Sequence, residues 1–171
     1  MGQFTTLLEE ALEAWEEVRM GVIEELRNIP EEKYDFHPAK DTRTVRELAI
    51  HILEVAMMMT GELTRSDTNL KRAPWPELLD TYASAAYRLK TKGEILSFMK
   101  KQLNSGMEKF REAGELHMLQ LIQRFDGNLG TRYAWLQHGI EQEMYHRGQL
   151  TVYARIIGLE PALTKLIKGE S

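Results

Sequence analysis

Apolar residues recur at steps of three and four residues along four long stretches of this chain, the spacing of one buried face of an α-helix. In the first stretch the stripe runs from Leu7 to Leu26. The four stretches are 4–27, 45–59, 92–113 and 131–157. No segment shows convincingly the two-residue alternation of a half-buried strand. The pattern therefore predicts an all-α protein.

Helix-breaking residues separate these stretches, and polar residues are placed to begin them. Breaks are expected at Pro30, Pro38, Pro74, Pro76, Gly127 and Gly130. Thr42 or Thr44 is expected to cap the second helix, because Glu47 lies three residues after Thr44, as in a capping box. A short helix is expected over 78–87. Thr131 is expected to begin the last helix, which Gly158 should end.

Four long helices in a chain of 171 residues predict a four-helix bundle. This length is that of one ordinary domain, so residues 1–171 are expected to form a single domain. The connection between the second and third long helices is long enough for a crossover rather than a simple up-and-down path.

Composition removes several classes of function. The chain has no cysteine, which excludes disulfides, thiolate zinc sites and a cysteine nucleophile. The net charge of −4, without any block of basic residues, argues against a nucleic-acid partner. No stretch approaches the roughly 20 apolar residues of a membrane span, and the acidic, amphipathic start does not resemble a signal peptide. A cytoplasmic protein without a membrane partner is expected.

An unusually polar stripe marks the last predicted helix. His138, Gln142, His146 and Gln149 follow one another at steps of four, four and three residues, and His51 is placed similarly in the second helix. Burying unpaired polar groups costs about 1–3 kcal/mol each. These side chains therefore need partners: each other, water, a ligand or a metal ion.

Helix geometry limits which of these residues share one metal ion. Side chains four residues apart can share an ion, whereas residues eight apart are separated by roughly 12 Å along the axis. His138 and His146 therefore cannot bind the same ion, and the feasible pairs are Gln142 with His146 or with His138. Imidazole is a good ligand for zinc, nickel or iron, and an amide is a poor one. On spacing alone, two buried histidines with ordinary hydrogen-bond partners are favoured over a metal site.

Two segments carry a resemblance to a known family. "YDFHPAKDTRTVRELAIHILEV" and "GTRYAWLQHGIEQEMYHRGQLTVYARIIGLEPA" resemble the signature regions of the DinB-like family, with "HRGQL" as the strongest part. The resemblance implies a DinB/YfiT-like four-helix bundle with a crossover connection, usually a homodimer. It also implies a divalent metal site with three ligands, which fall on His51, Gln142 and His146. Because Gln142 stands where the family has a histidine, the metal is expected to bind more weakly or to have been lost.

Neighbouring residues allow alternatives. Glu143 is either a carboxylate that orients an imidazole or a solvated residue, and the spacing favours the second. His138 is expected to be a pocket wall or a hydrogen-bonded core residue. Arg147 is expected to pair with a carboxylate such as Glu47 or Glu54, and Gln149 with the backbone. An apolar pocket is one expected place for a group of large apolar residues: Trp135, Tyr145, Tyr153 and Met57 to Met59. For most of them the core or a dimer interface is favoured.

The functional hypothesis follows from the resemblance. It implies a metal-binding protein that acts on a small-molecule substrate, either as a metal-dependent hydrolase or as an S-transferase that uses a low-molecular-weight thiol. In such a site the metal would lower the pKa of a bound water or thiol. The alternative is a non-catalytic bundle with a degenerate metal site that binds a ligand or a protein. Whether the chain is an enzyme stays open at this point.

Overall fold

Threonine side chains cap all four long helices of the computed structural model, which describes residues 6–169. Thr6, Thr44, Thr91 and Thr131 each accept a hydrogen bond from the backbone N–H three residues later. The helices they begin are α1 (Leu7–Asn28), α2 (Val45–Leu63), α4 (Lys92–Ala113) and α6 (Arg132–Ile156). The predicted capping box of Thr44 is confirmed. The predicted start of the first helix at Phe4 lies outside the described residues.

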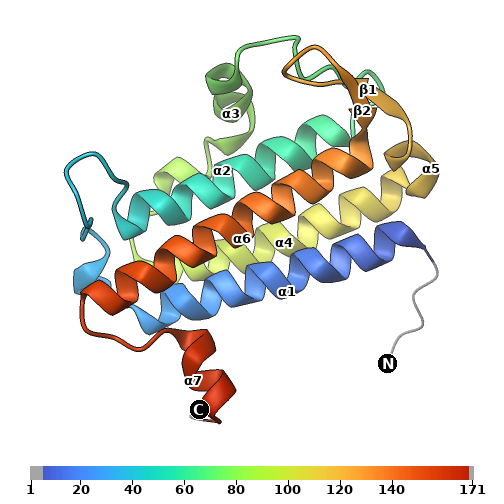
Figure 1. Ribbon diagram of the computed structural model, residues 1–171. Coiled ribbons are helices and arrows are strands. Elements are labelled where there is room, and N and C mark those ends of the chain that lie inside the picture. Colours follow the sequence, from blue (N-terminus) through green and yellow to red (C-terminus); the bar gives the residue numbers. More distant parts are fainter. Residues whose placement is uncertain (1–5, 170–171) are drawn as a thin grey trace.

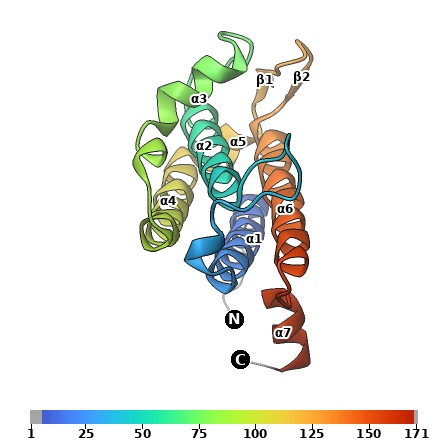
Figure 2. The same ribbon diagram turned by 90° about the vertical axis from the view of Figure 1, so that its left-hand side faces the viewer.

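The four helices form the predicted bundle. Helix α1 packs against α4 and α6, and α2 packs against the same two helices, so α1 and α2 occupy diagonal corners (Figure 2). Helices α2 and α4 run in the same direction, because the connection 64–91 returns along the length of the bundle (Figure 1). It ends beside the end of α1, where Nζ of Lys92 donates to the carbonyls of Arg27 and Ile29, each at 2.7 Å. The predicted crossover is confirmed.

Apolar stripes of the four helices meet in a core that consists of two clusters of buried residues. Trp15 of α1 packs edge-on against Phe110 of α4, with ring centroids 5.9 Å apart, and Leu12, Met58 and Leu103 surround them. Over residues 6–169, no helix combines the length and the apolar character needed to cross a membrane.

Short elements decorate the bundle: 3₁₀ turns at Glu31–Lys33 and Ala86–Arg88, and the helices α3 (Trp75–Ala83), α5 (Glu115–Met118) and α7 (Ala162–Lys168). The predicted helix over 78–87 is therefore wrong in its bounds. Pro76 was taken as a loop residue, but it lies in the first turn of α3, where the missing N–H of a proline leaves no bond unmade.

The absence of strands was also wrong. Strands β1 (Leu121–Gln123) and β2 (Leu129–Thr131) form an antiparallel hairpin, and Gly127 adopts a φ of 87° in its turn. Strands of three residues are too short to show alternation. Long-range contacts hold the hairpin instead: the backbone N–H of Leu70 donates to the carbonyl of Gln123 at 2.9 Å.

Candidate functional site

His51 of α2 and His146 of α6 face each other across the interface of these two helices. Their ring centroids are 4.9 Å apart, and the ring planes cross at 81°. Both residues are buried, with exposed fractions of 9% and 5%. Gln142, one turn before His146, places Nε2 3.4 Å from Nε2 of His51. The fold thus brings together the three residues that the sequence singled out, while their role as metal ligands stays a prediction.

Each imidazole is oriented by an acceptor three residues later on its own helix. Nδ1 of His51 lies 2.6 Å from Oε1 of Glu54, and Nδ1 of His146 lies 2.8 Å from Oε1 of Gln149. The other carboxylate oxygen of Glu54 accepts from the hydroxyl of Tyr87 at 2.9 Å. The sequence signal for both acceptors was the i, i+3 spacing behind each histidine. It was missed because Glu54 was assigned to Arg147 and Gln149 to the backbone.

These bonds assign a tautomer to both rings. Because the acceptors are oxygens, Nδ1 carries the proton and Nε2 has the lone pair in each ring. In His51 this lone pair faces the amide nitrogen of Gln142. Nε2 of His146 is buried and has no hydrogen-bond partner among the described residues. A buried, unpaired acceptor is costly unless something binds it. Protonated Nδ1 on an oxygen acceptor, with Nε2 free, is the arrangement of a metal-binding histidine.

The charges around the pair also suit a metal ion. Burial lowers the pKa of His146 below its ordinary value. For Glu54, burial raises the pKa, but the hydrogen bonds from His51 and Tyr87 outweigh it, and the net pKa is lowered. At neutral pH the site therefore holds a neutral His146 beside an ionised carboxylate. A metal ion requires such deprotonated ligands.

The third ligand is the weak point of this site. Over residues 6–169, no group of three or more histidine, cysteine, aspartate or glutamate residues is placed to hold a metal ion. Gln142 is outside that set of residue types, and in the structure its amide nitrogen faces His51. Rotating the amide would present its oxygen, a weaker ligand than imidazole. The residues present therefore fit a metal held by two imidazoles with weak support from an amide.

Glu143 has neither of its two expected roles. It is buried, and its carboxylate is held inside the bundle, where Oε2 accepts from Nε of Arg19 at 2.7 Å. Its Oε1 accepts from Nη2 of Arg19 at 2.5 Å and from the indole N–H of Trp15 at 2.7 Å. Arg19 also donates to Oε1 of Gln102 at 2.7 Å. The missed signal was a charged residue, Arg19, within the apolar stripe of α1.

The expected roles of Arg147 and Gln149 were also wrong. The guanidinium of Arg147 lies directly on Gly21 of α1, where an added Cβ would be 2.2 Å from Cζ. No carboxylate pairs with it among the described residues, and its Nε is buried without a hydrogen bond. Gln149 holds His146 instead of the backbone. Both side chains serve the packing of α6, one against α1 and the other within the site.

A cavity of about 640 Å³ opens beside the histidine pair. It is lined by His51, Met59, Trp75, Phe125, Trp135, His138, Gly139, Glu141, Gln142, Tyr145 and His146. Trp135, Tyr145 and Met59 line this cavity, although the core or a dimer interface was the favoured expectation for most of this group. His138 is an exposed wall residue. Met58 and Tyr153 are core residues, and Met57 lines a different cavity. Trp75 and Phe125 were missed, because only the crossover and the hairpin bring them to this place.

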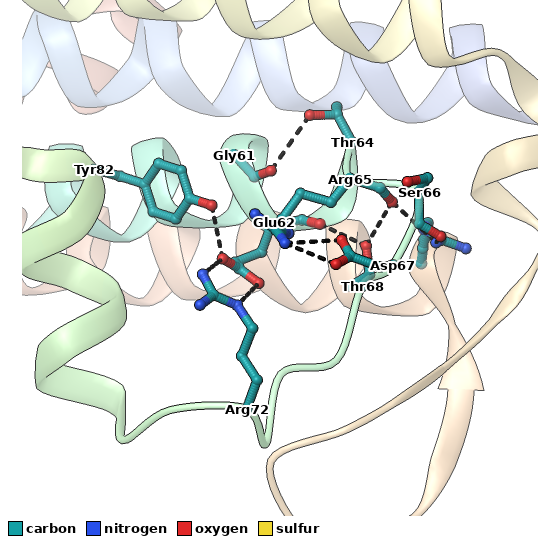
Figure 3. A network of polar contacts seen from close by, with 10 residues as sticks. Gly61, Glu62, Thr64, Arg65, Ser66, Asp67, Thr68, Arg72 and Tyr82 are labelled. Atoms are coloured by element: carbon teal, nitrogen blue, oxygen red, sulfur yellow. Dashed lines mark hydrogen bonds and ion pairs between the residues drawn. The ribbon is translucent and has the colours of Figure 1, made fainter.

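Figure 3 shows the polar network that fixes the crossover over this cavity. Glu62, at the end of α2, is fully buried. Its carboxylate accepts from the guanidinium of Arg72 and, at 2.7 Å, from the hydroxyl of Tyr82 on α3. The hydroxyl of Thr68 donates to the backbone carbonyl of Glu62 at 2.6 Å. Trp75 follows Arg72 closely, so this network positions one wall of the cavity.

The protein is thus a four-helix bundle with a crossover connection and a pair of buried histidines between α2 and α6. These two features define its class. The family model described as the DinB family matches residues 1–170, and the chain belongs to this family. None of the curated proteins compared with the chain matches it.

Solved structures share this fold. YfiT from Bacillus subtilis, described as a probable metal-dependent hydrolase with an unusual four-helix bundle topology, has a TM-score of 0.71 and 13% identity over 94% of this chain and 95% of its own. A DinB-like protein from Bacillus subtilis has a TM-score of 0.64 and 21% identity, over 87% and 92% of the two chains. A mycothiol-dependent maleylpyruvate isomerase has a TM-score of 0.67 and 15% identity, over 88% of this chain and 63% of its own.

Proposed function

We propose that His51 and His146, with Gln142 as a weak third ligand, hold a divalent metal ion and that the protein is a metal-dependent enzyme acting on a small molecule. The observation that carries this proposal is the buried, unpartnered Nε2 of His146, whose Nδ1 is held by Gln149. A divalent ion bound here would lower the pKa of a bound water or thiol and so supply a nucleophile near neutral pH.

The chain's own residues orient the two imidazoles and provide a cavity for the substrate. Glu54 and Gln149 fix the two rings, and Tyr87 fixes Glu54. The adjoining cavity, which His51 and His146 line, admits a small molecule to the same place. The two reaction classes that suit this arrangement are hydrolysis and thiol S-transfer. Structures of similar fold include a probable metal-dependent hydrolase and a mycothiol-dependent isomerase, which supports both classes.

Metal analysis and calorimetric titration of tag-free protein test the proposal. We expect zinc, nickel or iron(II) to bind with one ion per chain, and His51→Ala and His146→Ala to abolish this binding. His138→Ala is the matched control, because His138 lines the same cavity but its side chain is 63% exposed and lies outside the ligand set. Binding that survives both ligand substitutions, or that is absent from the wild type, would instead favour a non-catalytic bundle with a degenerate site.

We also propose that the protein forms a homodimer through the outer face of α6. Met144, Val152 and Ile156 are exposed apolar residues on this helix, at the spacing of one stripe. A stripe of exposed apolar side chains is typical of an interaction site. Light scattering after size exclusion is expected to give twice the chain mass, and Val152→Asp is expected to give the mass of one chain. A monomeric wild type contradicts this proposal.

A further inference from the structure

The cavity beside the histidine pair has aromatic walls from three separate parts of the chain. Trp75 comes from α3, Phe125 from the hairpin and Trp135 from α6. Their rings meet edge to face: the centroids of Trp75 and Phe125 are 5.0 Å apart, and those of Phe125 and Trp135 are 5.5 Å apart. Met59 and Tyr145 complete the apolar lining. Aromatic ligands pack favourably against rings in this arrangement.

An anionic ligand is disfavoured in this cavity. Among the lining residues in the described part of the chain there is neither lysine nor arginine. The acidic residue there, Glu141, has a 76% exposed side chain and would repel an anion. Moving a charged group out of water into such a lining is unfavourable without a charged partner.

A cationic ligand is disfavoured for a different reason. An aromatic box attracts cations when the faces of its rings are free. Here the guanidinium of Arg124 already lies over the Trp135 ring, 5.5 Å from its centroid. Arg124 is kept there by Asp126, at 3.3 Å. One face of the Trp135 ring is therefore already occupied by a guanidinium and is not free for a second cation.

We propose that this cavity binds an uncharged aromatic group of the substrate and so places the neighbouring reactive bond against His51 and His146. That the ligand is a substrate rests on the proposed function. The chemistry of the ligand is inferred from the cavity alone. A volume of about 640 Å³ accommodates a two-ring group together with the part of the molecule that reaches the histidines.

The test uses metal-free protein and three probes of one shape: naphthylmethanol, which is neutral, naphthoate, which is anionic, and naphthylmethylamine, which is cationic. Binding is followed by the indole N–H signals in proton–nitrogen NMR spectra. We expect the neutral probe to shift the signals of Trp75 and Trp135 in a saturable way. The signal of Trp15 is the internal control, because its N–H is held by Glu143 inside the bundle. Both ionised probes are expected to bind about tenfold more weakly or worse.

Variants locate the binding site within the cavity. Trp75→Ala and Phe125→Ala are each expected to weaken binding of naphthylmethanol by about tenfold. Leu129→Ala is the matched control, since Leu129 lies in the same hairpin but is exposed and does not line the cavity.

Three results overturn the inference: no shift of Trp75 and Trp135 with the neutral probe, equal binding of an ionised probe, or equal binding of the saturated analogue decahydronaphthylmethanol. Since no metal is present, these results are separate from the metal titration. A chain that binds metal but not naphthylmethanol loses only the inference, and one that binds naphthylmethanol but no metal loses only the proposed function.

Discussion

The carboxylate of Glu54, one helical turn after His51 on α2, accepts a hydrogen bond from Nδ1 of His51 at 2.6 Å. Through its other oxygen, Glu54 reaches the hydroxyl of Tyr87 on the connection between α2 and α4. The imidazole that faces His146 is thus tied to the crossover as well as to its own helix. This relationship makes the proposed metal site testable away from its ligands.

Replacing Glu54 by glutamine is expected to weaken metal binding by about tenfold, because a carboxylate that accepts from a ligand imidazole raises its basicity and fixes its orientation. Calorimetric titration with zinc measures the change. Glu141→Gln is the control, since Glu141 is an exposed carboxylate at the rim of the same cavity. Equal affinities of wild type and Glu54→Gln would show that Glu54 does not act on the site.

Replacing Gln142 by histidine is expected to strengthen zinc binding by about tenfold or more, because an imidazole replaces a weak amide ligand. Gln142 is placed for this, since its side chain already reaches Nε2 of His51. Competition with a chromogenic chelator measures the affinity. Gln137→His, on the same helix but not among the cavity-lining residues, should leave it unchanged. A Gln142→His protein that binds zinc no better than wild type contradicts the proposed ligand set.

Replacing Glu143 by alanine is expected to lower the free energy of unfolding by about 3–5 kcal/mol, because Arg19 would keep a buried charge without its partner. Urea unfolding followed by circular dichroism measures this change. The double variant Arg19→Met, Glu143→Leu is expected to be more stable than Glu143→Ala, since both charges are then absent. A double variant less stable than Glu143→Ala would contradict this explanation, because it would mean that the unpaired charge of Arg19 is not the main cause of the destabilisation.

Replacing Arg72 by methionine is expected to loosen the crossover. Glu62 is fully buried and, among residues 6–169, would keep only the hydroxyl of Tyr82 as a side-chain donor. Hydrogen exchange measured by mass spectrometry should increase in residues 64–83 and stay unchanged in α1. Arg88→Met, which removes an exposed arginine from the same connection, is the control. Unchanged exchange near Trp75 would show that the network does not hold this wall of the cavity.

The stability of the metal-free protein is expected to fall as the pH decreases below about 6.5. Burial lowers the pKa of His146, so the folded chain takes up this proton at lower pH than the unfolded chain does. Between the two pKa values the unfolded state binds more protons, and acid therefore favours unfolding. Urea unfolding from about pH 7.5 to about pH 5 should show a smaller loss in His146→Gln than in wild type. Parallel curves for the two proteins would contradict the prediction.

Local rules predicted much of this fold. The apolar stripes predicted the long helices, and Thr44 and Thr131 were correctly expected among their caps, because a cap and an apolar face each act within a few residues. The caps Thr6 and Thr91 were not predicted. Strands β1 and β2 were not predicted, because strands of three residues show no alternation and are held by a contact with Leu70, which is distant in the chain. The bounds of α3 were misjudged because proline has different effects in the first turn and in the interior of a helix.

The site was predictable in its centre and not in its surroundings. Helix spacing and the family resemblance together pointed to His51, Gln142 and His146, which meet in the structure. The orientation of the Glu143 side chain depends on Arg19, a partner more than a hundred residues away in the chain. A pattern of neighbouring residues cannot predict a contact between such distant positions. Trp75 and Phe125 depend likewise on the crossover and the hairpin, whose placement is a property of the whole bundle.

Gln142 and Glu143 are consecutive, yet one reaches His51 and the other reaches Arg19 in the interior. The rotation of α6 about its own axis is therefore also fixed by an ion pair on a neighbouring face of the helix, about 100° around the axis from Gln142. A substitution at position 142 is therefore expected to change what meets a ligand while the helix keeps its angular setting.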